Sequence, residues 1–334
     1  MSSVVLGLES TAHTFGVGLC SLDGDVLLNS SHTFTTREGG IHPREAAQHH
    51  QKYAPLLIQK ALDYIEKNKH KLVGVAFSQG PGLGPCLRIG AVAARSISLR
   101  FGIPLIGVNH SIAHIEIARK YSLSKDPITL FVSGGNTAVV DYTTQRYAVL
   151  GETLDISVGN LLDVFARNLG FGFPGTPKVL ELAEKATKYL GLPYSVKGQD
   201  MSFSGLLTAA RRLLNRGEDP ANLSYSVVET AFSMLTEATE RVLILTGKRE
   251  IALTGGVARA RRLIEMLEDV CKEHGSQLTV VPPSLAGDNG AMIAYVGSLL
   301  YQSKKYLEIE KSRVLPRWRI EEVDIPWRKY SDYK

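Results

Sequence analysis

Apolar and polar residues alternate at the start of the chain. Residues 4–34 read VVLGLESTAHTFGVGLCSLDGDVLLNSSHTF, and this alternation, with a turn signal at Asp23-Gly24, predicts strands joined as a hairpin or meander. A long helix is expected from Pro43 to Lys67, because Pro43 falls in its first turn and apolar residues recur on one face. The pattern then predicts a strand over 72–77, a helix over 89–101, a strand over 104–108 and a further helix.

The same order of elements starts again at Ile128. Residues 128–152, ITLFVSGGNTAVVDYTTQRYAVLGE, again read as strand, small polar turn, strand, turn and strand. The rest predicts helices over 158–169, 178–190, 204–215 and 223–245, a strand over 250–253, a helix after a Gly-Gly turn, a strand over 277–281, a last helix and an irregular basic tail. Two successive units of this kind predict a duplicated, two-lobed α/β architecture, in which ligands usually bind in the cleft between the lobes.

Composition agrees with a two-lobed globular protein. The chain has 334 residues, more than one hydrophobic core usually holds, and its content of 44% apolar and 21% charged residues is ordinary. The net charge of +5 is compatible with an acidic partner such as RNA, although many proteins of similar charge bind nothing acidic.

The cysteines and the N-terminus bear on the compartment. Cys20, Cys86 and Cys271 show no C-x-x-C spacing, which argues for a reducing compartment and against a disulfide framework or a zinc ribbon. The first residues, MSSVVLGLES, lack a basic segment, and no stretch of the chain approaches about 18 uncharged apolar residues. We therefore expect no signal peptide, no membrane span and a soluble cytoplasmic protein.

Two histidines lie one helical turn apart in NHSIAHIEIA, residues 109–118. His110 and His114 would project from the same helix face, either as two ligands of one metal ion or as ordinary histidines of a half-buried helix. A metal needs a further ligand, and Asp288 in AGDNGAMIAY is a candidate, although it could simply cap the last helix. Two imidazoles and a carboxylate would suit iron or zinc with open positions. The missing glutamate of H-E-x-x-H argues against a zincin protease.

Three small-residue turns lie at the ends of predicted strands. ESTAHT, VSGGNT and TGGVAR all offer backbone N–H groups that no bulky side chain shields, and such turns can hold phosphate. Each turn alone is weak evidence for phosphate binding, because most glycine-rich turns only reverse the direction of the chain. Three of them in two lobes favour a nucleotide-type ligand in the cleft, although none matches the P-loop or the G-x-G-x-x-G pattern.

Three other segments each allow a structural and a functional interpretation. Asp163 lies on an otherwise apolar helix face, where its partner is either a ligand hydroxyl or Arg167, four residues further on. The loop QGPGLGPCLRIGA is either a rigid turn into a helix or an ordered loop that aims Arg88 at an anion. The tail motif PRWRIEEVDIPW mixes arginine with two tryptophans, which could stack on nucleic-acid bases or, as we favour, pin the tail to its own domain.

Taken together, these motifs resemble one family. LGLESTAHTFGVG, IHPREAAQHH, SQGPGLGPCLRIGA, VNHSIAHIE, LFVSGGNT, GNLLDVFARNLGFGFPG, MSFSGLLTAA, TGGVA and DNGAMIAY occur in this order across nearly the whole chain. They are similar to the motifs of the archaeal and eukaryotic tRNA N6-adenosine threonylcarbamoyltransferase, the catalytic subunit of the KEOPS complex. The resemblance implies the actin/hexokinase/heat-shock-chaperone (ASKHA) fold. With this fold we expect an N-terminal lobe of residues 1–125, completed by residues from about 290 to 334, and a C-terminal lobe of residues 126–289.

The resemblance also implies an activity and its ligands. The reaction is transfer of a threonylcarbamoyl group from threonylcarbamoyl-AMP to the 6-amino group of adenosine 37 in tRNAs that read codons beginning with A. The implied cofactors are one divalent metal per subunit, iron before zinc, and an adenine nucleotide or threonylcarbamoyl-AMP in the cleft. The implied partners are tRNA and other KEOPS subunits, including a small protein kinase. The implied metal ligands are His110, His114 and Asp288, and the implied substrate- and nucleotide-binding residues are Val132, Ser133, Gly134, Gly135, Asp163, Gly255 and Gly256.

Four positions depart from the pattern of the family. Phe131 replaces a tyrosine that can contact the metal, and Thr176 and Leu180 replace a glycine and a glutamate near the nucleotide. Ala260 replaces an asparagine of the motif GGVAANN, so an amide contact is lost there. These changes weaken or alter several adenylate contacts, while the metal ligands and the phosphate turn remain. Two further hypotheses are therefore kept: a scaffold subunit that has lost turnover, and a small-molecule kinase of the same fold, in which the histidine pair has no obvious role.

Overall fold

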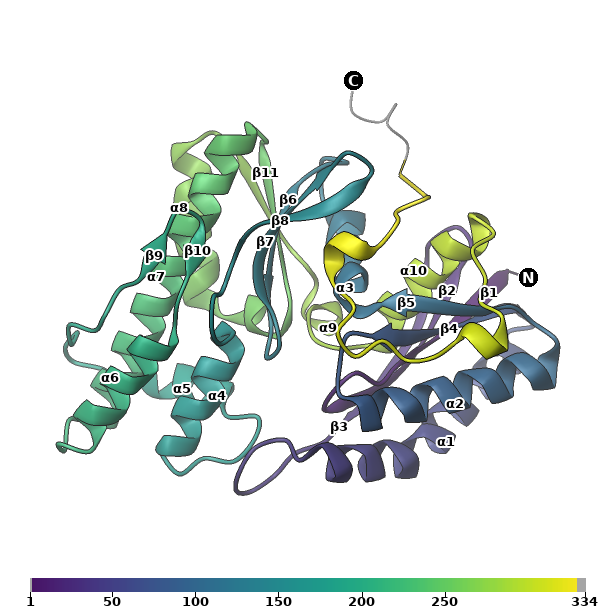
Figure 1. Cartoon of the computed structure of the whole chain (residues 1–334), viewed down its shortest axis with the longest axis horizontal. Helices are drawn as coiled ribbons and strands as arrows, with labels where there is room; N and C mark the ends of the chain where they lie inside the picture. The colour runs from purple at the N-terminus through teal and green to yellow at the C-terminus, as the bar shows by residue number, and fades with distance from the viewer. Residues whose placement is uncertain (1, 329–334) are drawn as a thin grey trace.

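The computed structural model describes residues 2–328, which form two lobes, each built on a five-stranded mixed sheet (Figure 1). In the first sheet the order is β3-β2-β1-β4-β5, and the central strand β1 pairs antiparallel with β2 and parallel with β4. The expected turn at Asp23-Gly24 joins β2 to β3. The strands are β1 (Ser3–Glu9), β2 (Thr14–Ser21), β3 (Val26–Thr33), β4 (Lys71–Gly80) and β5 (Leu105–Asn109).

The second sheet repeats the connectivity of the first. Its order is β12-β11-β6-β7-β8, and its central strand β6 pairs antiparallel with β7 and parallel with β11, as β1 does with β2 and β4. The predicted duplication of the α/β unit is therefore confirmed. The strands are β6 (Ile128–Val132), β7 (Thr137–Thr143), β8 (Arg146–Glu152), β11 (Glu250–Thr254) and β12 (Gln277–Val280).

Two pairs of helices cover the two faces of the first sheet. One pair packs on the face that carries Leu6, Val17 and Phe77, and the other packs on the face that carries Val5 and Ile106. Because successive strand residues point to opposite faces, a sheet covered on both sides is apolar at nearly every position. The pairs are α1 (Pro43–Lys67) with α2 (Gly84–Phe101), and α3 (His110–Tyr121) with α10 (Gly290–Gln302).

Small residues let α10 approach the first sheet at backbone contact. Gly7, Gly16 and Gly18 of β1 and β2 face the N-terminal half of α10, and a Cβ atom on Gly16 would lie 2.7 Å from the backbone nitrogen of Gly290. Even alanine at these positions would overlap the helix. The contact fixes the start of α10, and with it the preceding turn that carries Asp288, against the end of β1.

Helices of the second lobe enclose a large core built around Phe165, Phe203 and Phe232. No helix within residues 2–328 is long and apolar enough to cross a membrane. The elements of this lobe outside its main sheet are α4 (Val158–Asn168), α5 (Thr176–Ala183), β9 (Val196–Lys197), β10 (Asp200–Met201), α6 (Ser204–Leu214), α7 (Pro220–Thr246), η1 (Gly256–Arg259), α8 (Arg261–Glu273) and α9 (Pro283–Ala286).

One predicted helix is wrong at its C-terminal end. The sequence pattern extends it over 178–190, whereas α5 ends at Ala183. Asn222 of α7 accepts hydrogen bonds from the backbone N–H groups of Thr187 (2.8 Å) and Lys188 (3.0 Å). A side chain of another helix therefore takes the amides that a continued α5 would bond internally, a tertiary contact that local periodicity does not show.

After α10 the tail contacts both lobes. Leu307 forms a bridge with Leu105 at the edge of the first sheet, and two short 3-10 turns follow, η2 (Ile309–Lys311) and η3 (Ile320–Glu322). Beyond η3 the side chains of the tail pack against β7 and β8 of the second lobe. The tail therefore runs from one lobe to the other, in front of α3 in the view of Figure 1.

Candidate active site

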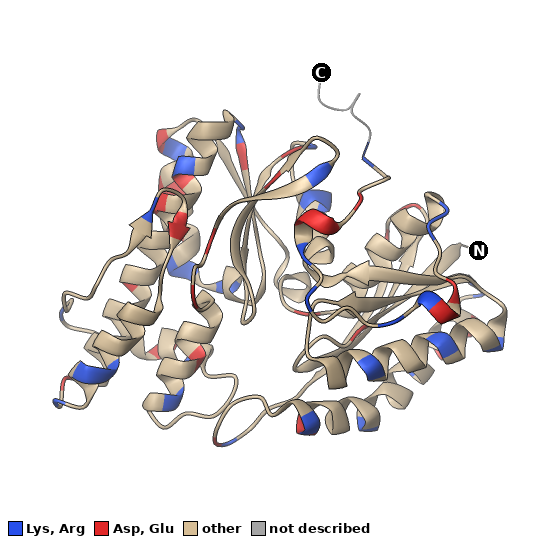
Figure 2. Ribbon diagram, in the orientation of Figure 1, with Lys and Arg blue, Asp and Glu red and all other residues tan. Residues whose placement is uncertain are grey.

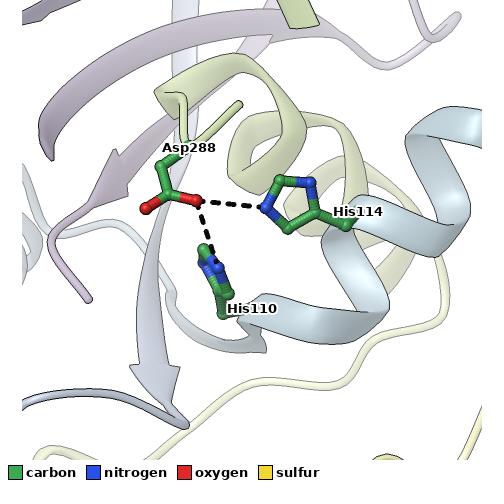
Figure 3. A group of neighbouring side chains, drawn as sticks. All are labelled: His110, His114 and Asp288. Carbon is green, nitrogen blue, oxygen red and sulfur yellow. Dashed lines mark hydrogen bonds and ion pairs between the residues drawn. The ribbon is translucent and has the colours of Figure 1, made fainter. Parts of the chain in front are cut away.

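The helix α3 begins at the first of the two paired histidines. Asn109 caps this helix, because its side-chain oxygen accepts hydrogen bonds from two backbone N–H groups of the first turn at 3.0 and 3.1 Å. The cap fixes His110 at the first helical position, and His114 follows one turn later on the same face. Both imidazoles are buried and point toward Asp288 (Figure 3).

Asp288 completes a cluster of three possible metal ligands. Its Oδ1 lies 3.2 Å from Nε2 of His114 and 3.4 Å from Nε2 of His110. A metal with bonds of about 2.0–2.2 Å brings its ligand atoms about 3.0–3.4 Å from one another. The two pairs that include Asp288 have this separation, and all three ligand atoms lie within 4.8 Å of one another. Within residues 2–328 this is the one group of histidine, cysteine or acidic side chains whose ligand atoms converge in this way.

A buried glutamate that the motifs did not single out stands behind His110. Glu9 ends β1, and its Oε2 lies 2.9 Å from Nδ1 of His110. Its Oε1 accepts hydrogen bonds from the N–H (2.6 Å) and the hydroxyl (2.5 Å) of Thr11. A carboxylate on the second nitrogen of a ligating histidine fixes the tautomer and orientation of the ring. The ESTAHT turn therefore lies at the metal side, and the sequence signal was the one ionisable residue in an apolar strand.

Two carboxylates set the charge of this cluster. Burial opposes protonation of His110, but Glu9 and Asp288 outweigh it and raise the pKa of the imidazole to about 9. Burial lowers the pKa of His114 and so favours its neutral form. Burial disfavours the ionised form of Asp288, yet His110 and the hydrogen bond from His114 hold the pKa of that carboxyl below its usual range. One protonated imidazole thus balances the carboxylates, a role that a bound cation would take over as the proton leaves.

The chemistry of the donor set fits a divalent transition metal. Imidazole nitrogen and carboxylate oxygen together suit iron or zinc. Nδ1 of His114 is buried and has no hydrogen-bond partner among the described residues, so the contact of its Nε2 with Asp288 is the one hydrogen bond of this ring there. Phe131 on β6 packs its ring 4.8 Å from the ring of His114 and is fully buried. Phenylalanine contributes no oxygen, so the cluster offers three protein ligands.

The VSGGNT turn follows Phe131 directly and therefore lies beside the metal cluster. Ser133 shapes the turn, because its hydroxyl accepts hydrogen bonds from the N–H groups of Gly135 (3.3 Å) and Asn136 (3.0 Å). Ser157, at the start of α4, donates to the carbonyl of Gly134 (2.6 Å). A side chain at Gly134 or Gly135 would meet nothing within 4 Å, so the backbone of these two residues is accessible to a ligand.

The TGGVAR turn packs on Val132, the first residue of the VSGGNT turn. Gly255 has a φ of +100°, and a Cβ atom there would overlap the carbonyl of Val132. Only glycine adopts this positive φ readily and also leaves room for the carbonyl of Val132. Gly256 next to it faces open space. The structure thus brings Val132–Gly135 and Gly255–Gly256 together at the ends of two neighbouring strands, where backbone N–H groups can face a phosphate.

Asp163 has partners that the sequence analysis did not name. Its Oδ1 accepts hydrogen bonds from the N–H of Gly175 (2.9 Å) and from the N–H and hydroxyl of Thr176 (both 2.8 Å). The alternative partner Arg167 is not among its contacts with the described residues. The carboxylate therefore holds the start of α5, and its Oδ2 makes no hydrogen bond to the described part of the chain.

Three of the four unusual positions have a structural explanation. Thr176, where the family pattern has glycine, adds the hydroxyl that bonds Asp163. Leu180 packs against the core of the second lobe, and Ala260 is 3% exposed in the same core. Both side chains contact the apolar core, which accounts for an apolar residue at each position.

Two mixed sheets of the same connectivity give the chain the actin/hexokinase-like fold, and a His-His-Asp cluster lies beside its open glycine turns. Solved structures show the same fold: HypF from T. kodakarensis matches with a TM-score of 0.63 at 15% identity over 93% of this chain and 49% of that one. A 2-hydroxyisocaproyl-CoA dehydratase activator from Clostridium difficile with bound ADPNP matches with a TM-score of 0.53 at 10% identity over 90% and 97% of the two chains.

The chain belongs to the tRNA N6-adenosine threonylcarbamoyltransferase family, whose profile matches residues 25–295. It is 53% identical to the enzyme of that name from Thermofilum pendens over 97% of both chains. It is 54% identical to the one from Caldivirga maquilingensis over 97% of this chain and 98% of that one. It is also 50% identical to a probable bifunctional tRNA threonylcarbamoyladenosine biosynthesis protein from Methanothermobacter thermautotrophicus, over 98% of this chain and 61% of that protein. The protein is therefore a transferase that modifies tRNA, and tRNA is its substrate.

Proposed function

We propose that this chain transfers the threonylcarbamoyl group of threonylcarbamoyl-AMP to the 6-amino group of adenosine 37 in tRNAs that read codons beginning with A. The observation that carries the proposal is the convergence of His110, His114 and Asp288 next to a glycine turn with an accessible backbone. A bond forms between the adenosine nitrogen and the carbamoyl carbon, the bond from that carbon to the phosphate oxygen of AMP breaks, and the amine loses a proton.

Residues of the two lobes divide this work. Backbone N–H groups of Gly134 and Gly135 face the phosphate of the adenylate, and the free Oδ2 of Asp163 accepts a hydrogen bond from a ribose hydroxyl. A divalent metal held by the His-His-Asp cluster would polarise substrate oxygens as a Lewis acid. The two histidines of the cluster are buried, so the side chains around them limit the access of water, which would otherwise hydrolyse the mixed anhydride.

For the metal we propose iron, with zinc as the alternative. Two histidines and one carboxylate with further positions open form the ligand pattern typical of non-haem iron, and the same donors also bind zinc. Metal analysis of protein purified without chelators, under anaerobic conditions, distinguishes the two. We expect one metal per subunit, and the loss of that metal when the histidines are replaced.

We further propose that the chain acts as the catalytic subunit of KEOPS, with a small protein kinase among its partners. The bifunctional Methanothermobacter relative supports this, because this chain covers only 61% of it, so a second segment is joined to the transferase there. We also assign residues 1–125, with the stretch from about 290 to 334, to one lobe and residues 126–289 to the other; residues 1 and 329–334 of these ranges lie outside the described part of the chain. The two sheets of equal connectivity support that division.

The experiment is transfer of threonylcarbamate to unmodified tRNA by the purified complex. The variant His110→Ala should lose both bound metal and transfer. His274→Ala is the matched control. His274 directly follows α8, is half-buried, pairs with Glu240 of α7 and belongs to no ligand cluster. Full transfer by His110→Ala would refute the metal role.

A second candidate function is a scaffold subunit with weakened catalysis. Leu180 and Ala260 favour it, because their side chains pack in the core where the family has polar side chains near the nucleotide. A small-molecule kinase of the same fold is the third candidate, and it predicts phosphorylation without tRNA. Calorimetry with ATP or a stable adenylate analogue separates the first two, because micromolar or tighter binding argues against a degenerate site.

A further inference from the structure

The tail forms an open groove that the proposed reaction does not use. The groove has a volume of about 590 Å³ and is lined chiefly by Arg313, Leu315, Arg317, Trp318 and Glu322. Its volume lies within the roughly 300–1,000 Å³ typical of ligand sites. The tail therefore does more than connect the two lobes, because it presents a basic and aromatic surface to solvent.

Hydrogen bonds fix the backbone beneath this groove. The N–H of Leu315 donates to the carbonyl of Gln79 (2.7 Å), and the N–H of Gly82 donates to the carbonyl of Pro316 (3.2 Å). The side chain of Gln79 also donates to the carbonyl of Arg313 (2.8 Å). The loop QGPGLGPCLRIGA thus clamps the tail. Because these hydrogen bonds hold the backbone of the tail in place, the side chains that line the groove extend from fixed positions toward solvent.

The groove adjoins the candidate active site. The side-chain amide of Asn109 donates to the carbonyl of Trp318 (3.2 Å), and the oxygen of the same side chain caps α3. The residue after Asn109 is His110. The backbone beneath the groove therefore contacts the residue that precedes His110.

The groove carries positive charge that the protein does not neutralise. Arg313 and Arg317 are exposed and form no ion pair with any residue in 2–328. A Cβ atom on Gly84 would lie 3.5 Å from the guanidinium of Arg88 and 4.0 Å from the ring of Pro316, so Arg88, also exposed, lies beside the tail. Figure 2 shows basic positions along both α2 and the tail.

Acidic side chains near the groove are already engaged. Glu322 accepts a hydrogen bond from the N–H of Arg319 (3.1 Å). The guanidinium of Arg319 in turn lies 3.4 Å from Glu321 and 3.9 Å from Glu152. The contrast between the paired Arg319 and the unpaired Arg313 and Arg317 marks the two unpaired arginines as available for an anionic partner.

We propose that this groove holds a strand of the substrate tRNA next to the adenosine that reacts. Exposed guanidinium groups bind phosphates, and the half-buried ring of Trp318 offers a stacking face for a base. The hydrogen bond between Asn109 and Trp318 places the groove next to the start of α3, the helix that carries the two histidines of the metal cluster. The inference rests on the proposed function for the identity of the reacting base, while binding of tRNA by the groove is measured separately from transfer.

The first experiment measures the affinity of full-length chain for unmodified tRNA across a series of salt concentrations. The double variant Arg313→Gln with Arg317→Gln should bind at least tenfold more weakly. Its plot of log affinity against log salt should be shallower by about 1.4–1.8, because two phosphate contacts are lost. Arg212→Gln with Arg216→Gln is the matched control, since it removes the same charge from exposed positions at the end of α6, and it should bind as the wild type does.

The second experiment uses the tryptophans as reporters. The chain has two, Trp318 and Trp327. Trp327 also lies in the tail, and it packs against apolar residues of both lobes. Addition of an anticodon stem-loop should quench the fluorescence of the wild-type chain and of Trp327→Phe, through stacking on Trp318. Quenching should be lost in Trp318→Phe, which keeps an aromatic ring for packing. Equal quenching in Trp318→Phe and the wild type would exclude stacking at this residue.

The outcomes separate the groove from the reaction. Wild-type affinity and salt dependence in the arginine double variant would overturn the proposal, as would an equal loss in the control, which would indicate a general effect of charge. Loss of binding to a protein partner with unchanged binding of tRNA would also overturn it and assign the groove to an acidic protein. If the wild type transfers nothing while the double variant still loses tRNA, the proposed function fails and the groove stands. Metal content and binding of an adenylate analogue should be unchanged in every variant.

Discussion

The metal side and the nucleotide side of the candidate site are built on different principles. On the metal side two buried histidines and the half-buried Asp288 converge, and His110 is held from behind by Glu9. On the nucleotide side the backbone of two glycine turns faces open space, and the side chains that could have framed a ligand pack in the core instead. The metal side therefore depends on individual side chains, and the nucleotide side depends on backbone conformation. Substitutions should be severe on the first and mild on the second.

The largest effect is expected from Asp288→Asn. An amide keeps the shape of the side chain but removes the charge that binds a cation, so metal content should fall below one tenth of a mole per mole. Transfer should fall by about 1,000-fold, equal to roughly 4 kcal/mol of lost transition-state stabilisation. Metal analysis and single-turnover transfer measure the two effects. Asp269→Asn, an exposed position on α8, is the control, and parity between the two variants would contradict the metal assignment.

A smaller effect on the same side is expected from Glu9→Gln. Glutamine keeps a hydrogen-bond acceptor but not the charge, so the His110 ring is held less firmly in its orientation, and metal affinity should fall about 10–100-fold. Competition with a chelator measures the affinity, and the absorption spectrum of the cobalt-substituted protein reports the altered ligand field. Thr11→Val removes one hydrogen bond to Glu9 and should weaken metal binding by only about fivefold, near 1 kcal/mol. If Glu9→Gln bound metal as the wild type does, the glutamate would be merely structural.

The sequence alone predicts much of this comparison, because its strongest signals are local. Helical spacing predicts that His110 and His114 share a face, and small residues after an apolar strand predict the turn at Val132–Gly135. Duplicated order of elements predicts two similar sheets. These features depend on neighbours in the chain, so periodicity and residue type are sufficient to find them.

Contacts between distant segments could not be predicted in the same way. No local rule places Glu9 at His110, since 101 residues separate them, or directs Asp163 to the start of α5 instead of to Arg167. The early end of α5 has the same origin, because Asn222 of α7 takes its amides. The meeting of Asp288 with the histidines depends on the close contact of α10 with the first sheet, which Gly16 permits.

On the nucleotide side a moderate effect is expected from Asp163→Asn. The neutral amide accepts hydrogen bonds less strongly than the carboxylate, both from α5 and from a ribose hydroxyl. Affinity for an adenylate analogue should fall about tenfold, near 1.4 kcal/mol, while metal content stays unchanged. Calorimetry measures the affinity, and metal analysis measures the metal content. Glu181→Gln, an exposed carboxylate on the same helix α5, should bind the analogue normally, and a loss of metal in Asp163→Asn would show that the two sides are not independent.

The smallest effect is expected from Thr176→Gly, which restores the glycine of the family pattern. The change removes the hydroxyl that bonds Asp163 and adds backbone freedom at the first turn of α5, so the free energy of unfolding should fall by about 1–2 kcal/mol. Two backbone N–H groups still hold Asp163 in place. The affinity for adenylate should therefore change by less than about threefold, roughly 0.6 kcal/mol. Thermal unfolding and calorimetry on the same preparation measure the two quantities. A tenfold gain in adenylate affinity would mean that Thr176 obstructs the ligand, and that side chains as well as backbone shape the nucleotide side.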